Sequence, residues 1–129
     1  MTFQELLAQI QTLKIEESRG QAEEYFEAVI STANLDALHK ILTSYFGAPL
    51  KPEGVPPSSE AKECAGPYGG IRKDQTMYFR RDGEYSECAL LWPWGSGNRV
   101  TMKVIRSTGS DPAGGGWMDM FKNIFNRNS

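Results

Sequence analysis

The sequence predicts an α+β fold: three N-terminal antiparallel helices, a three-stranded antiparallel meander and a C-terminal amphipathic helix. Apolar residues recur at helical spacing over residues 2–46, whereas over residues 75–106 they alternate as they do in strands. An Asp82-Gly83 pair interrupts the alternating segment and is typical of a hairpin turn. The chain has 129 residues, the usual size of one domain, so we expect residues 1–129 to form a single unit.

The first predicted helix begins at residue 3, because Thr2 and Glu5 have the spacing of a capping box. A second capping pattern over residues 18–21 predicts a second helix, whose buried face would run from Ala22 to Ala33. On that helix the acidic side chains are expected to face water: Glu23, Glu24 and Glu27.

A third helix is expected from the N-cap Asn34 to Phe46, because Gly47 and Pro49 stop it. Residues 1–46 are therefore the predicted helical part of the chain. Residues 47–70 contain five prolines and five glycines, which predicts a loop wrapped over the core, with a short helix over residues 58–64.

The predicted sheet occupies residues 71–106, with its second turn between Pro93 and Asn98. If Asp82 and Gly83 are the central pair of a type I′ turn, Met77 lies opposite Cys88. One face would then be the core: Met77, Phe79, Cys88, Leu90, Trp92, Val100, Met102 and Val104. The other face would stay in contact with water and would carry Tyr78, Arg80, Tyr85, Glu87, Thr101 and Lys103.

Residues 107–116 are rich in glycine and predict a tether, behind which residues 117–126 form an amphipathic helix. A helix this short is marginal alone, so we expect it to dock on a surface. Its large apolar residues make it a candidate interaction helix, for a protein partner, a homodimer or the chain's own sheet: Trp117, Phe121 and Phe125.

The net charge of −2 argues against nucleic acid as a partner, since nucleic-acid-binding proteins favour clustered positive charge. Residues 1–65 carry a charge of −5 and residues 66–110 a charge of +3. The first residues lack both a basic region and a long apolar run, so neither a signal peptide nor a membrane partner is expected. A cytoplasmic location follows as the expectation, with Cys64 and Cys88 as reduced thiols.

The residues favour no catalytic site, metal or cofactor. The single histidine, His39, and the two cysteines lack the spacing of metal ligands. A Cys–His pair would need one of these cysteines to lie beside His39 in space, and Cys64 is the more reactive thiol of the two in this prediction.

Aromatic and basic residues provide the candidate binding sites. A rigid ligand site is expected between the 66–72 loop and the 92–99 turn, carried by Tyr68, Arg72, Trp94 and Arg99. The outer sheet face adds Tyr78, Arg80, Tyr85 and Lys103. These residues favour a non-catalytic binding or protein-interaction module. Two alternatives are a small enzyme or enzyme subunit with its pocket between those loops, and a weak anion or single-stranded nucleic-acid binder on the outer face.

Overall fold

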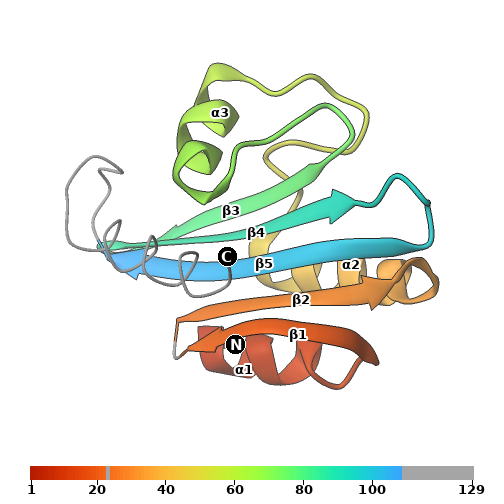
Figure 1. Ribbon diagram of the computed structural model, residues 1–129. Coiled ribbons are helices and arrows are strands. Elements are labelled where there is room, and N and C mark those ends of the chain that lie inside the picture. The colour runs from red at the N-terminus through yellow and green to blue at the C-terminus, as the bar shows by residue number, and fades with distance from the viewer. Residues whose placement is uncertain (23, 109–129) are drawn as a thin grey trace.

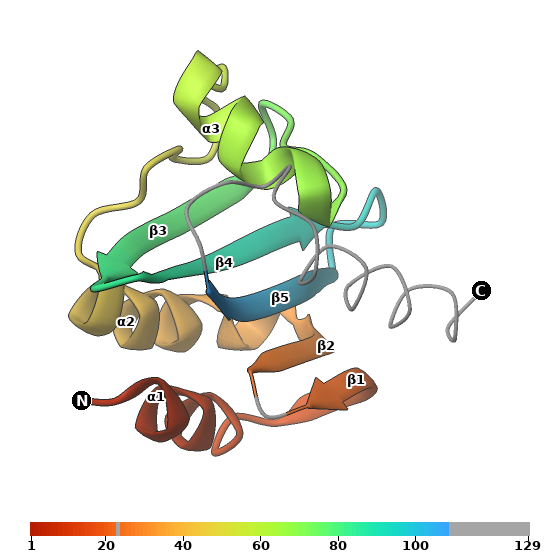
Figure 2. The same cartoon turned by 90° about the vertical axis from the view of Figure 1, so that its left-hand side faces the viewer.

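The computed structural model describes residues 1–22 and 24–108. Over these residues the chain is α+β, with three α-helices and a five-stranded antiparallel sheet of strand order β1-β2-β5-β4-β3. Helices α1 and α2 cover one face of the sheet and α3 covers the other, so the fold has three layers (Figures 1 and 2). The predicted arrangement of three N-terminal helices before a three-stranded meander is therefore wrong, although the α+β class is correct.

Helix α1 spans Phe3–Ile10 and begins where the capping box predicts. The Thr2 hydroxyl accepts a hydrogen bond from the Glu5 amide, and the Glu5 carboxylate accepts one from the Thr2 amide. Its buried stripe packs on the sheet: Phe3, Leu6, Leu7 and Ile10.

The segment predicted as the second helix is a hairpin of β1 (Ile15–Ala22) and β2 (Tyr25–Ser31). Strand β2 lies between β1 and β5 and is buried from Tyr25 to Ile30. An interior strand covered on both faces does not alternate between apolar and polar residues. Its run of apolar side chains therefore also fits helical spacing, which explains the wrong prediction. Glu27, expected in water, is 7% exposed.

Helix α2 spans Leu35–Phe46 and confirms the third predicted helix. It ends at Gly47, whose φ of 83° is accessible to glycine at low cost. A 3₁₀ turn over Thr32–Asn34 links it to β2. The wrapping loop contains α3, Ser59–Ala65, close to the expected bounds, followed by a 3₁₀ turn over Gly66–Tyr68.

Strands β3 (Thr76–Asp82), β4 (Tyr85–Pro93) and β5 (Arg99–Thr108) are consecutive antiparallel neighbours, as the meander prediction requires. Their register differs from the predicted one, because Asp82 pairs with Tyr85 and Met77 with Leu90. The central residues of the turn are thus Gly83 and Glu84. Gly83 has a φ of 62° and no non-glycine residue among those described has a positive φ, which fits type II′ and not type I′.

Apolar residues lie on both faces of the sheet, because helices cover both. Val100, Met102 and Val104 pack against α1 and α2, in the same cluster as Tyr78, which is 2% exposed and not on a wet surface. Met77, Cys88 and Leu90 pack against α3 on the opposite face. The single core face assembled from the sequence therefore combines residues of two separate layers.

The two edges of the sheet differ. Lys51 pairs with Met77 through two backbone hydrogen bonds of 3.0 and 3.1 Å, so the wrapping loop covers part of the β3 edge. Strand β1 forms the other edge and has register shifts at Ile15/Glu17 and Ser18/Gly20.

The predicted tether begins inside β5, which ends at Thr108. The rest of the tether and the predicted helix over 117–126 lie outside the described residues. Within the described part of the chain, no helix has the length and apolar composition needed to cross a membrane.

Candidate functional site

One group of charged side chains lies at the end of the sheet face that α1 and α2 cover. Arg80, Glu87 and Arg106 are cross-strand neighbours on β3, β4 and β5. Glu87 is fully buried and accepts a hydrogen bond from the Tyr45 hydroxyl at 2.5 Å. It also pairs with Arg106 and lies 3.7 Å from Nε of Arg80. Two cations thus compensate one buried carboxylate, as a charge in that position requires.

A cavity of about 510 Å³ opens over this ladder. Its lining comes from the start of α1, the β1–β2 turn, the end of α2 and strands β3 to β5: Met1, Thr2, Phe3, Gln4, Glu24, Tyr45, Arg80, Asp82, Tyr85 and Arg106. The volume is in the range of small-molecule sites. We refer to it as the Arg80 cavity.

A second group lies at the opposite end of the sheet, where β4 turns into β5. The Trp94 amide donates to the Arg99 carbonyl at 2.9 Å, and the Gly97 amide donates to the Trp94 carbonyl at 3.0 Å. The indole Nε1 of Trp94 donates to the Thr101 hydroxyl at 2.9 Å, which fixes the orientation of the ring. The backbone and side chain of Trp94 are therefore both held in place.

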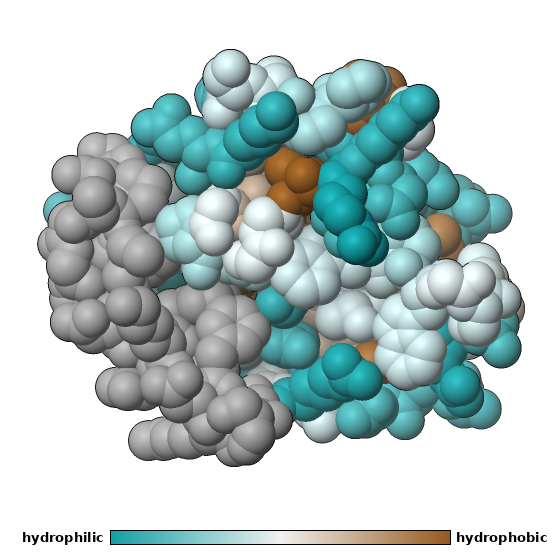
Figure 3. Space-filling view, turned by 45° about the horizontal axis from the view of Figure 1, so that its top comes forward, coloured by the Kyte–Doolittle hydropathy of each residue, from teal (hydrophilic) through white to brown (hydrophobic). Residues whose placement is uncertain are grey.

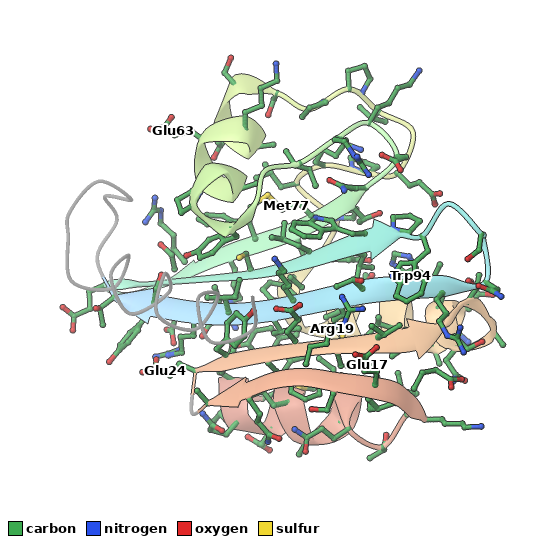
Figure 4. The ribbon with its side chains drawn as sticks, in the orientation of Figure 1. Glu17, Arg19, Glu24, Glu63, Met77 and Trp94 are labelled. Carbon is green, nitrogen blue, oxygen red and sulfur yellow. The ribbon has the colours of Figure 1, made fainter. Side chains whose placement is uncertain are left out.

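Two guanidinium groups flank this indole. Arg19, on β1, lies 5.6 Å from the ring centroid and Arg99, on β5, lies 5.9 Å from it, both within the range of cation–π attraction. Figure 4 shows Glu17, Arg19 and Trp94 on the same side of the sheet. We call the group of the exposed Arg19 and Arg99 and the half-buried Trp94 the Trp94 surface.

A buried lysine lies further along the same face. Nζ of Lys103 lies 3.9 Å from the Trp92 ring centroid and donates to the Tyr68 carbonyl at 3.2 Å. Burial lowers the pKa of Lys103 to about 8, with Arg19 acting in the same direction and Glu27 against it. The Tyr25 hydroxyl hydrogen-bonds to Glu27, the residue that pairs with Lys103 across β2 and β5.

The structure separates the residues that the sequence singled out. Tyr68, Lys103, Trp94 and Arg99 belong to the α3 side of the sheet. Arg72 is exposed and its ion pair among the described residues is with Asp74, at 3.6 Å. The space between the 66–72 loop and Trp92 is closely filled, because a Cβ at Gly69 would lie 2.5 Å from the Trp92 ring.

Tyr78, Arg80 and Tyr85 lie on the other side, so the expected surface that joined them to Lys103 does not form. Tyr78 belongs to the core, where its hydroxyl is 2.8 Å from Nδ1 of His39. Arg80 and Tyr85 instead line the Arg80 cavity. Figure 3 shows the α3 side as a mosaic of hydrophilic and neutral residues with small hydrophobic areas.

Several residues of these two groups were not predicted: Arg19, Tyr45, Glu87 as a buried ion and Arg106. Charged residues alternate with apolar ones in β3 and β5, which indicated one charged face but not which helix would cover it. Arg19 could not be placed, because its segment was predicted to be helical.

The described residues do not support a Cys–His pair. His39 contacts Tyr78 in the cluster under α2, whereas Cys64 and Cys88 pack in the cluster under α3. Both cysteines are free thiols, and burial raises the pKa of each, which keeps them protonated and poorly nucleophilic. Within residues 1–22 and 24–108, no three His, Cys, Asp or Glu side chains are grouped as a metal site.

Comparison of the chain with models of known protein families, with curated proteins and with solved structures found no match.

Proposed function

We propose that this chain is a non-catalytic protein-interaction module that binds an acidic segment of a partner protein through the Trp94 surface. The observation that carries the proposal is a tryptophan held in one orientation between two exposed guanidinium groups. Tryptophan and arginine are the residues most often found at the energetic centres of protein interfaces.

The rigidity of the turn supports this function. Besides its internal hydrogen bonds, the 93–98 turn is tied to the 3₁₀ segment before α2. The Thr32 amide donates to the Asn98 carbonyl and the Thr32 hydroxyl donates to the Gly97 carbonyl, each at 3.0 Å. A side chain presented on a fixed turn loses little conformational entropy on binding, which favours affinity.

The charges on the Trp94 surface favour an acidic partner. Arg99 is exposed and forms no ion pair with a described residue. Arg19 pairs with Glu17 at 3.4 Å, but the two side chains are 37% and 55% exposed, and ion pairs in contact with solvent contribute little. A carboxylate of the partner can therefore bind Arg99 directly and can replace Glu17 at Arg19.

Selection of random 12-residue peptides against the full chain tests this function. Selected peptides are expected to be enriched in Asp and Glu. We expect Arg99→Glu and Trp94→Ala each to weaken binding of the best peptide at least tenfold.

The matched control is Lys40→Glu, the same reversal of charge at an exposed position of α2, on the other side of the sheet. It should leave the peptide affinity unchanged. Peptides without acidic enrichment, or an affinity that Arg99→Glu and Lys40→Glu reduce equally, would contradict the proposal. Melting curves of each variant show whether it is folded.

A further inference from the structure

The two guanidinium groups of the Arg80 cavity differ in the number of carboxylates with which they already pair. Arg106 pairs with Glu87, with Asp82 at 3.2 Å and with Glu24 at 3.5 Å, and Tyr85 stacks on it at 3.7 Å. Nε and Nη1 of Arg106 are thus already paired with three carboxylates.

Arg80 differs from Arg106 in this respect. Its ion pair with Glu87 is 3.7 Å long and involves Nε, and its N–H groups donate no hydrogen bond to a described residue. The Tyr45 ring lies 4.6 Å from its Cζ atom and holds the guanidinium plane. Its side chain is 32% exposed and lines the cavity. Arg80 therefore presents a preoriented fork of donors suited to a carboxylate.

Two carboxylates line the same cavity. Asp82 and Glu24 share a single cation, Arg106, and their side chains are 53% and 40% exposed. A carboxylate has about four acceptor sites, so each of these keeps capacity for a further donor. The cavity thus offers one site for a negative group and two acceptors for a positive one.

From this arrangement we infer that the Arg80 cavity binds a free α-amino acid as its zwitterion. Arg80 would receive the carboxylate of the ligand, and Asp82 with Glu24 would receive its ammonium group. Arg80 and Asp82 are alternate residues of β3 on one face, so their Cα atoms are about 7 Å apart. That spacing suits a ligand whose opposite charges are attached to the same carbon.

Part of the remaining lining favours an apolar ligand side chain. Met1, 54% exposed, and the half-buried Tyr85 contribute apolar surface to the cavity. Contact with them would remove apolar area of the ligand from water. Leucine and phenylalanine are therefore the preferred ligands, whereas glycine lacks this contribution.

Titration of the full chain with leucine and phenylalanine, followed by calorimetry and by amide chemical shifts, tests the inference. N-acetylphenylalanine lacks the ammonium group and phenylalaninamide lacks the carboxylate. Each is expected to bind at least tenfold more weakly than phenylalanine. Phenylalanine should shift the amide signals of residues that line the cavity.

Two substitutions locate the binding. Arg80→Gln and Asp82→Asn should each reduce phenylalanine affinity at least tenfold, whereas Arg81→Gln, on the other face of β3, should not. Asp82 is exposed, so its variant remains informative if Arg80→Gln fails to fold. Absence of binding at millimolar phenylalanine would overturn the inference, as would equal binding of the blocked compounds. The protein-interaction function rests on other residues and is not affected by either outcome.

Discussion

The backbone of Gly69 lies directly against the indole ring of Trp92. A Cβ built at position 69 falls 2.5 Å from Cη2 of Trp92, closer than real Cβ atoms approach, and 3.2 Å from Cζ2, which is tighter than most Cβ contacts. The φ of Gly69 is +111°, a value that disfavours any residue with a Cβ. Another neighbour of the Trp92 ring is the ammonium group of Lys103. The missing side chain at Gly69 therefore lets the 3₁₀ turn pack closely on the sheet.

Gly69→Ala is therefore expected to be more destabilising than Gly70→Ala. Both glycines have a positive φ, but a Cβ at Gly70 meets no atom within 4 Å. Gly70→Ala should cost about 1–2 kcal/mol from backbone strain. Gly69→Ala should cost a further 1–3 kcal/mol, roughly, because Trp92 must move. Urea unfolding of the two variants measures the difference, and equal midpoints would show that the contact contributes nothing.

The fully buried carboxylate of Glu87 should be essential for stability. Glu87→Gln removes the carboxylate that pairs with Arg80 and one of the three that pair with Arg106, so we expect a loss at the lower end of the about 3–5 kcal/mol typical of a broken buried ion pair. Asp82→Asn removes an exposed carboxylate from the same Arg106 and should cost about 1 kcal/mol or less. Thermal melting of both variants measures the contrast. A Glu87→Gln variant as stable as Asp82→Asn would show that the buried ladder is not stabilising.

Lys51 is 1% exposed and its ammonium group hydrogen-bonds to the backbone carbonyls of Pro52, Lys73 and Gln75. Lys51→Met would keep the alkyl chain and remove the donor from all three carbonyls. We expect a loss of about 2–4 kcal/mol, since unpaired buried acceptors are costly. The exposed Lys73 supplies the control, Lys73→Met, which should have little effect.

Amide hydrogen exchange gives a second measure of the same contact. The Met77 amide donates to the Lys51 carbonyl at 3.0 Å, so its exchange should accelerate in Lys51→Met. Unchanged exchange at Met77 would show that the loop holds the β3 edge without the ammonium group.

Local signals in the sequence predicted those parts of the fold that depend on local interactions. The Thr2–Glu5 capping box and the Gly47 stop each act within one turn of helix, and α1 and α2 occur where these signals predict. The β3–β4–β5 meander was predicted for the same reason, because alternation and turns are read over a few residues.

Features that depend on distant packing could not be predicted. Whether Tyr25–Ser31 is helix or strand depends on pairing with β5, whose partner residues lie 68 to 80 positions later in the chain. The register of the β3–β4 hairpin depends on which two residues form its turn. Because these are Gly83 and Glu84, and not Asp82 and Gly83, every residue of β3 and β4 has a partner that differs from the predicted one. At the candidate sites, Trp94 and Arg99 were identified together, but Arg19 joins them only through the β1–β2 hairpin that the sequence did not indicate.

The buried Lys103 should make stability depend on pH in a defined direction. Burial lowers its pKa to about 8 in the native state, whereas an unfolded lysine titrates near 10.4. Between these values the unfolded chain binds more protons, so this group makes the protein more stable as the pH rises. Below pH 8 both states are protonated and the full cost of the buried charge is present. Between the native and the unfolded pKa of Lys103, the free energy of unfolding should rise by an amount on the order of 3 kcal/mol.

Comparison with Lys103→Met at each pH isolates this contribution. Burial raises the pKa of Cys88 and Tyr68 as well, and these groups lower stability at high pH in both proteins. The free energy of unfolding of Lys103→Met should therefore exceed that of the unmodified chain most at pH 7. This difference should be smaller at pH 10. Lys62→Met, at an exposed position of α3, should differ in stability from the unmodified chain by an amount that does not change with pH. If the Lys103→Met difference is equally flat, Lys103 titrates at its ordinary pKa and its ammonium group is hydrated in the native state.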